Sequence, residues 1–260
     1  MHRAMTLACL ILTACPSDSL EDAGPLSGGD GGSSLDAGTT VADVGVGDCG
    51  ESWVLSYEIG GTFHIEETPL GAGDTEKPLT PGLLRLRVPG DENGPSTGTA
   101  QLLELHFAEN FEVTSFGIRT TTRNNVRVGP SPCGAGQGEF DGSVIVWDTC
   151  TPGEGFGVDR NSWTPESGAS GPGCAQGMQT SGNVHCEGVM CGSGGLEEGD
   201  NPQNDRYDQK LNNFVFSADL STVEMEKVEI PNREPSRTFI SLAGTQSEAS
   251  QAPLPACLCP

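Results

Sequence analysis

The chain has 260 residues and a formal charge of −23, from 13 Lys and Arg against 36 Asp and Glu. Such an acidic composition argues against nucleic-acid binding through phosphate contacts, which require clustered cations. No stretch approaches the ~20 consecutive apolar residues of a membrane-spanning helix. Ten Cys in a chain with 37 Gly favour an oxidising compartment over the cytosol.

The amino terminus has the layout of a secretory signal peptide. Arg3 precedes a short apolar run over residues 4–12. The string Leu12-Thr13-Ala14-Cys15 resembles the lipobox of bacterial lipoproteins. The resemblance implies that residues 1–14 are removed as a signal peptide and that the thiol of Cys15 is acylated, so that lipid chains such as palmitate anchor the protein to a membrane. The alternative is an ordinary signal peptide in which Cys15 is incidental.

Residues 15–48 combine this Cys with an acidic segment rich in Gly and Ser. Residues 16–48 contain seven acidic residues, eight Gly and no Lys, Arg or aromatic residue. Such a segment cannot bury enough apolar surface to offset its chain entropy, so we expect a disordered tether spanning about 30 Å on average. Pro16 replaces the Asp that commonly retains lipoproteins in the inner membrane, which favours the outer membrane. Whether the domain faces the periplasm or the outside stays open.

Strand patterns dominate the start of the β-rich domain expected over residues 49–260. Apolar and polar residues alternate over 53–59, and Gly60-Gly61 then predicts a turn or a bulge before the pattern resumes at 62–66. Further strands are predicted at 84–88, 103–107, 111–122 and 126–128.

The middle of the domain has a different composition from its two ends. Residues 129–200 contain 18 Gly and five Cys, with one predicted strand at 143–147. We expect long loops that disulfides link to the rest of the domain, with a separate disulfide-rich subdomain as the alternative.

Strand patterns return after this region, at 213–217, 223–230 and 239–242. Residues 220–227 also fit one helical turn, but Val223, Met225, Val228 and Ile230 fit a strand with a single bulge. Together these elements predict an all-β fold, an antiparallel β-sandwich of jelly-roll type.

Eight Cys remain after Cys9 in the signal peptide and the lipidated Cys15 are set aside. An even number permits four disulfides, in any of 105 connectivities. A bond from Cys49 to Cys257 or Cys259 would join the two ends of the domain. The alternative is a zinc site at His185, Cys186 and Cys191, with Cys257 and Cys259 as an irregular second pair. The eight Cys are Cys49, Cys133, Cys150, Cys174, Cys186, Cys191, Cys257 and Cys259.

Acidic and amide side chains are densest over residues 197–208, which predicts either a calcium site or a solvated acidic loop. The Pro at position 202 does not fit the spacing of an EF-hand. The candidate ligands are Asp200, Asn201, Asn204, Asp205 and Asp208. Apart from these calcium and zinc alternatives, the sequence suggests no cofactor.

Motifs for nucleophilic or zinc-dependent hydrolysis are missing from the sequence, so the catalytic residues stay unknown. Glu104 with Glu58 or Glu66 would be one carboxylate pair for glycoside cleavage. His64 and His106 alternate with apolar neighbours, and we expect both to point outward into solvent. Three aromatic residues in the middle region, Trp147, Phe156 and Trp163, fit either burial or a surface that stacks on sugars.

These observations favour a lipid-anchored envelope protein that displays a disulfide-stabilised β-sandwich for a structural or recognition role. One alternative is an envelope hydrolase or lyase acting on carbohydrates through loop carboxylates. The other is a carbohydrate-binding adhesin. The expected partners are the membrane, through the lipid, and a glycan or an envelope protein, but no nucleic acid.

Overall fold

The computed structural model describes residues 50–65, 75–115, 118–151, 169–189, 191, 197–230 and 238–258. In this part of the chain thirteen strands pair into one sheet, every pairing is antiparallel, and the only helical element is a 3-10 turn. None of the described residues forms a helix long and apolar enough to cross a membrane. The elements are β1 (Glu51–Ile65), β2 (Thr75–Pro78), β3 (Thr80–Asp91), β4 (Gly94–Pro95), β5 (Gly98–Ser115), β6 (Ile118–Val128), β7 (Gln137–Phe140), β8 (Val144–Val146), β9 (Ala175–Glu187), β10 (Gly199–Gln209), β11 (Phe214–Phe216), β12 (Thr222–Ile230), β13 (Thr238–Pro253) and η1 (Ala256–Leu258).

Alternation of apolar and polar residues explains the long strands, because successive side chains of a strand point to opposite faces. Leu55, Tyr57 and Ile59 of β1 are all buried, as the alternation predicts. In β12 the register against β13 shifts between Met225 and Val228, which is the single bulge expected there. The prediction of an all-β, antiparallel, sandwich-like fold is confirmed.

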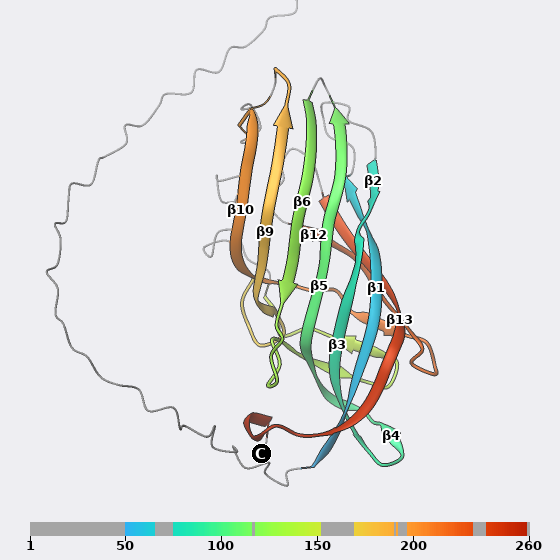
Figure 1. Ribbon diagram of the computed structural model, residues 1–260. Helices are drawn as coiled ribbons and strands as arrows, with labels where there is room; N and C mark the ends of the chain where they lie inside the picture. The colour runs from blue at the N-terminus through green and yellow to red at the C-terminus, as the bar shows by residue number, and fades with distance from the viewer. Residues whose placement is uncertain are drawn as a thin grey trace, which may run out of the picture. The chain divides into compact units, whose positions relative to one another are not determined.

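Strand β5 is the branch point of the sheet. One of its edges pairs with β3, while the other is divided between β7, which pairs with residues 98–101, and β6, which pairs with residues 105–115. The order β5-β7-β8-β11-β12-β13-β1-β3 therefore returns to β5 and closes a ring of eight strands. We call these eight strands the strand ring. Figure 1 shows its long strands β5, β3 and β1 in front, with β12 and β13 behind.

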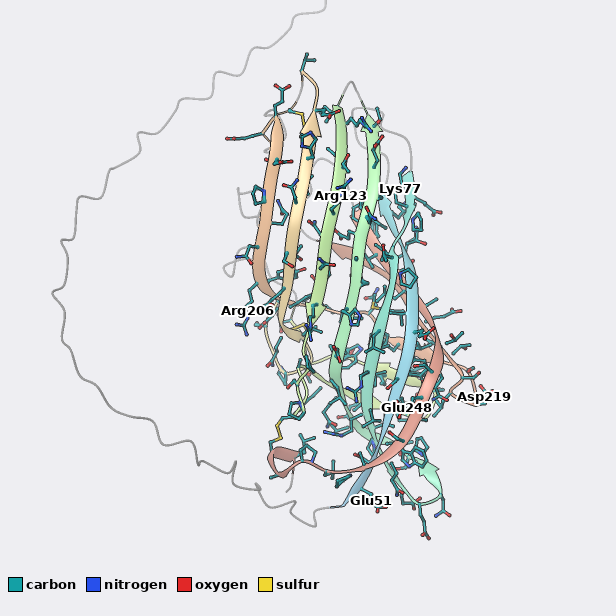
Figure 2. All side chains as sticks on the ribbon, viewed as in Figure 1. Glu51, Lys77, Arg123, Arg206, Asp219 and Glu248 are labelled. Atoms are coloured by element: carbon teal, nitrogen blue, oxygen red, sulfur yellow. A yellow bond between two sulfur atoms is a disulfide. The ribbon has the colours of Figure 1, made fainter. Side chains whose placement is uncertain are left out.

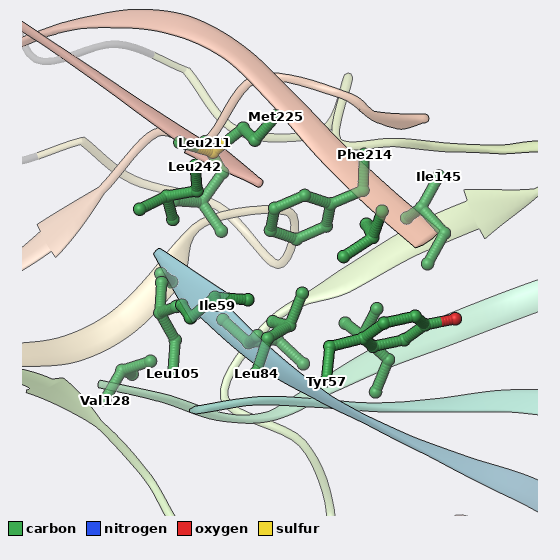
Figure 3. Close-up of a cluster of buried hydrophobic side chains, with 14 of the residues drawn as sticks. Tyr57, Ile59, Leu84, Leu105, Val128, Ile145, Leu211, Phe214, Met225 and Leu242 are labelled. Carbon is green, nitrogen blue, oxygen red and sulfur yellow. The ribbon is translucent and has the colours of Figure 1, made fainter. Parts of the chain in front are cut away.

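Apolar side chains from opposite halves of the strand ring meet in its interior. Figure 3 shows Tyr57, Leu84 and Leu105 on one side facing Phe214 and Leu242 on the other. The rings of Tyr57 and Phe216 lie 5.9 Å apart, and the Tyr57 hydroxyl donates to the Leu220 carbonyl at 2.9 Å. The two halves thus pack as the two layers of a sandwich.

Strands β6, β9 and β10 extend the sheet beyond β5, and we call the four strands β5, β6, β9 and β10 the side sheet. The inner face of the side sheet continues the core with Val126 and Met178. Farther along this face lies a buried polar pair, in which Asn124 Nδ2 donates to Glu109 Oε2 at 3.2 Å. The outer face carries the alternate residues of each strand, and its side chains are exposed or half-buried.

The structure differs from the expectation at two places. No turn or bulge forms at Gly60-Gly61, because β1 runs straight through and its register against β13 shifts earlier, between Ser56 and Tyr57. Region 129–200 also contains more strand than expected, since β7 and the 13-residue β9 lie within it. β9 completes its hydrogen bonds with β6 and β10, although its Gly-rich sequence has little apolar alternation.

Candidate functional site

The five candidate calcium ligands all lie in β10, which is a strand rather than a loop. Neighbouring residues in a strand point to opposite faces, and Asp200 and Asp208 are roughly 26 Å apart at 3.3 Å per residue. Within the described residues no group of three or more His, Cys, Asp or Glu is placed to hold a metal ion. The structure therefore does not bring the candidates together, and a calcium requirement stays a prediction.

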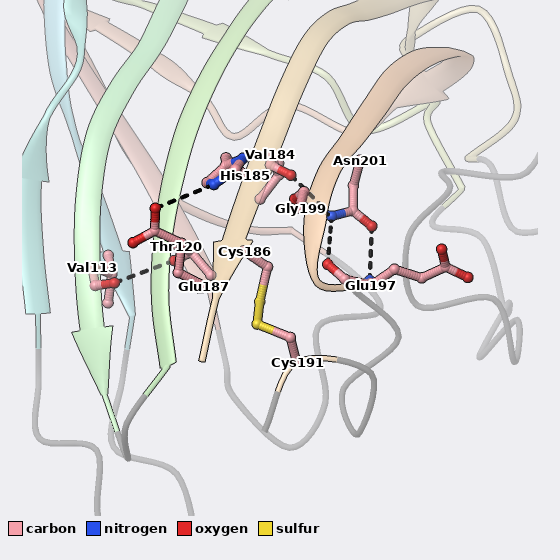
Figure 4. Close-up of a disulfide and its surroundings, with 10 residues drawn as sticks. All are labelled: Val113, Thr120, Val184, His185, Cys186, Glu187, Cys191, Glu197, Gly199 and Asn201. Atoms are coloured by element: carbon pink, nitrogen blue, oxygen red, sulfur yellow. Dashed lines mark hydrogen bonds and ion pairs between the residues drawn. A yellow bond between two sulfur atoms is a disulfide. The ribbon is translucent and has the colours of Figure 1, made fainter. Parts of the chain in front are cut away.

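Asn201 holds the hairpin between β9 and β10 instead (Figure 4). Its Nδ2 donates to the carbonyls of Val184 and Glu197 at 3.1 and 2.9 Å, and its Oδ1 accepts from the Glu197 amide at 2.8 Å. The bond from Cys186 to Cys191 closes the same end of β9. The zinc alternative at this position is therefore wrong, because disulfide sulfurs cannot act as thiolate ligands.

Two further disulfides join Cys150 to Cys174 and Cys133 to Cys257, so the prediction of disulfide bonds is confirmed for six Cys. The Cys133–Cys257 bond rules out a link from Cys49 to Cys257. Cys49 and Cys259 lie outside the described residues, as do Cys15 and the rest of residues 1–49. Even parity predicts that Cys49 pairs with Cys259, and non-reducing peptide mapping would test this pairing.

The carboxylates proposed for catalysis do not form a free pair. Glu104 is mostly buried and has three basic neighbours, Arg127 at 3.6 Å, Arg85 at 3.8 Å and His106 at 3.9 Å. Glu58 lies on β1, with β3 between it and β5, and Glu66 lies outside the described residues. The surroundings of Glu104 are those of an ion-paired side chain.

The histidines and aromatic residues also have distinct surroundings. His106 is half-exposed as expected, whereas the outward, solvated placement of His64 is wrong. His64 is buried beside Phe239, and its Nδ1 lies 3.1 Å from Glu76. Trp147 is fully buried against Phe214, so it is unavailable to a sugar. Trp163 and Phe156 lie outside the described residues.

The outer face of the side sheet carries a group of polar and basic side chains that the strand register brings together. Three cross-strand rows contain no carboxylate and no aromatic or large aliphatic side chain. We call them the basic patch; the rows are His106-Arg127-Gln179-Arg206, Ala108-Asn125-Ser181-Asn204 and Asn110-Arg123-Asn183-Pro202. All twelve residues are exposed or half-buried. Figure 2 labels Arg123 on β6 and Arg206 on β10 within the patch.

A groove of about 780 Å³ adjoins the first row of the basic patch. Arg127 Nε donates to the Gly129 carbonyl at 3.1 Å, which holds this side chain at the groove. Arg206 lies over Gly177, where a β-carbon would approach its Nη2 to 2.9 Å, so glycine leaves room for the guanidinium. The polar residues that line the groove are Arg127, Ser131, Gln176, Gln179, Arg206, Tyr207 and Asp208.

Charges beyond the patch are paired, and within it Arg127 and His106 have Glu104 as a carboxylate neighbour. Arg119, on the same face of β6, binds Glu112 at 2.6 Å and Glu187 at 3.4 Å, and this guanidinium lowers the pKa of Glu112. The hydrogen bond that His185 Nδ1 donates to Asp200 Oδ1, at 2.7 Å, raises the pKa of His185. In the described part of the chain, by contrast, no carboxylate forms an ion pair with Arg123 or Arg206. The patch therefore has free cationic hydrogen-bond donors.

Comparison with known proteins adds no precedent for this arrangement: no family model, curated protein or solved structure matches the chain. The function must therefore be inferred from the geometry of the site itself.

The sequence contained a signal for the patch that composition alone does not reveal. Arg119, Arg123 and Arg127 are spaced four residues apart, so in a strand they share one face. The residues of β9 and β10 that complete the rows are not predictable in the same way. Their positions depend on which strands pair and in which register.

Proposed function

We propose that this chain is an exported recognition protein that is anchored by lipid at Cys15 and binds a polar ligand on the outer face of the side sheet. The basic patch and its adjoining groove carry this proposal. In a chain of charge −23, a surface that gathers three arginines, of which only Arg127 has a carboxylate partner, is unexpected unless the arginines meet a ligand.

The arrangement favours binding over catalysis. Glycoside cleavage by the common route needs two carboxyl groups on either side of the scissile bond. Asp208 lines the groove, but its Oδ1 accepts a 2.7 Å hydrogen bond from the Gly177 amide. Glu104 is held by its basic neighbours. The guanidinium, amide and hydroxyl groups of the patch are hydrogen-bonding groups that orient a ligand.

The extracytoplasmic setting rests on the lipobox and on the disulfides. Disulfides persist in oxidising compartments, and three of them occur in the described residues. Replacing Cys15 with Ser should release the protein from the membrane fraction and abolish labelling by radioactive palmitate. Cys9→Ser is the matched control, because this Cys lies within the proposed signal peptide. Retention of the Cys15→Ser variant on the membrane would contradict the anchor.

One experiment separates recognition from catalysis. The full chain is applied to an array of neutral and acidic glycans and acidic peptides, and the same compounds are assayed for cleavage in solution. We expect retention of at least one class without cleavage. Cleavage would replace the proposal with the hydrolase or lyase alternative, and the absence of any binding would overturn it.

A further inference from the structure

The basic patch combines features that restrict its ligand. Its cations are Arg123, Arg127 and Arg206, with His106 at the edge. The other residues are mostly amides and one hydroxyl, from Asn, Gln and Ser. No aromatic or large aliphatic side chain interrupts it. Binding here must therefore depend on charge-assisted and neutral hydrogen bonds rather than on apolar burial.

We propose that the basic patch binds an acidic polysaccharide, with arginines on the carboxylates and amides on the sugar hydroxyls. This inference rests on the proposed recognition function and specifies its ligand class. Arginine presents a planar set of donors that matches a carboxylate in two parallel hydrogen bonds. Asn and Gln side chains both donate and accept, as a row of hydroxyl groups requires.

A protein partner fits the patch less well. Stable protein interfaces have an apolar or aromatic centre that is desolvated on binding. The only apolar side chains of the patch are those of Ala108 and Pro202. A flat surface of amides and guanidinium groups is better suited to a hydrated, hydroxyl-rich polymer.

The spacing of the arginines determines which charges of a polymer can reach them. Arg127 and Arg206 are two strands apart in the same row, which places their backbones roughly 10 Å apart. Arg123 and Arg127 are four residues apart along β6, or roughly 13 Å. An acidic polysaccharide with a carboxylate on every sugar can therefore meet successive arginines with every second or third sugar, while the sugars between them present hydroxyl groups to the amides.

The acidic character of the whole protein does not prevent this binding. At physiological ionic strength charges are screened over about 8 Å, so carboxylates far from the patch act weakly on a bound polymer. Direct contacts with the arginines persist under these conditions. At 1 M salt the screening length falls to about 3 Å, and we expect the affinity to fall strongly.

Polygalacturonate is a suitable probe, and its methyl ester is a matched ligand that lacks the charge. Binding to the full chain is measured by calorimetry in 0.15 M and 1 M NaCl. We expect binding to polygalacturonate at 0.15 M, and weaker binding by at least tenfold at 1 M and for the methyl ester. Equal affinity for the methyl ester would overturn the proposal, because the carboxylates would then contribute nothing.

The triple variant Arg123→Gln, Arg127→Gln and Arg206→Gln tests the location. All three side chains are exposed, and Glu104 keeps Arg85 and His106 as basic neighbours, so the melting temperature should change little. We expect a loss of affinity of about tenfold for each arginine. Arg119→Gln is the matched control, because Arg119 is on the same face of β6 but outside the patch, and its affinity should stay within about twofold of wild type. An unchanged affinity in the triple variant would overturn the proposal.

The remaining outcomes distinguish a wrong ligand class from a wrong proposed function. Binding of neutral dextran but not of polygalacturonate would overturn the ligand class and leave recognition intact. Tighter binding of polyglutamate than of polygalacturonate would overturn it in favour of an acidic polypeptide. Failure to bind any member of the array would remove both proposals together.

Discussion

The strand ring and the side sheet are both built by antiparallel backbone pairing, but their faces have different surroundings. In the ring, strands from two halves enclose Tyr57, Trp147 and Phe214, so that stability comes from buried apolar surface. In the side sheet only the inner face joins this core. Its outer face is left to polar side chains and is available to a ligand. The comparison indicates that the strand ring is the main source of stability, and we propose that the side sheet supplies the binding surface.

The largest expected effect on the free energy of unfolding comes from removing a disulfide, because two of the disulfides close loops of very different length. Cys133–Cys257 spans 124 residues and should contribute about 5 kcal/mol to the free energy of unfolding by the loop-entropy model. Cys186–Cys191, at the end of β9, spans five residues and should contribute about 2 kcal/mol. Urea unfolding of the two double Cys→Ser variants would measure this difference. Equal losses of unfolding free energy in the two variants would contradict the expected difference between the two disulfides.

Two neighbouring positions of the short strand β11 allow the contribution of the ring interior to stability to be compared with that of its surface. Phe214 is 1% exposed and Val215, its neighbour in β11, is 42% exposed. Phe214→Ala leaves a cavity and should cost about 4 kcal/mol, with a fall in Tm of roughly 10 °C. Val215→Ala is the matched control and should cost less than about 1 kcal/mol. Similar Tm values for the two variants would show that the ring interior is not the main source of stability.

A glycine substitution tests how closely the strands of the side sheet approach. A β-carbon on Gly182 would lie 2.1 Å from the Arg123 carbonyl oxygen, and the φ of +153° is unfavourable for other residues. Gly182→Ala should therefore separate β9 from β6, lower stability by about 2 kcal/mol and weaken ligand binding at the patch. Gly60→Ala is the control, because a β-carbon there meets nothing within 4 Å. Unchanged amide-exchange protection in β9 would contradict the expected separation.

The smallest effect is a pH dependence at the outer face of the side sheet. His185 contacts Asp200 at 2.7 Å and Glu187 at 3.3 Å, and its raised pKa in the folded state means that folding favours the protonated ring. This contribution is complete below the unfolded pKa of about 6.5 and is lost as the pH rises through the higher folded value. The Tm should therefore decrease slightly over this interval.

His185→Gln should abolish this part of the pH dependence, and Asp200→Asn should reduce it. NMR titration of the ring would report the pKa directly. Because the pair is exposed, the effect is small. A Tm profile that the His185→Gln substitution leaves unchanged would assign the pH dependence to other groups.

Several strands could be predicted because local alternation and burial agree in them. β1, β3 and β12 each bury one face against the core, and the bulge of β12 follows from its apolar spacing. β9 escaped prediction because Thr180 and Gly182 interrupt the apolar residues of its inner face, such as Met178 and Val184, and so break the alternation. The buried position of His64 was also not predictable, since it depends on the neighbouring Phe239 and Glu76.

The sequence by itself determined the class of the fold and the presence of disulfides, because alternation and Cys content are local or additive properties. Only the tertiary structure decided how the strands join. Ser52 and Ala252 pair across 200 residues, and the closure of the strand ring depends on such contacts. The basic patch has the same origin: its arginines share a face by local spacing, but its rows exist because β6, β9 and β10 pair in one register.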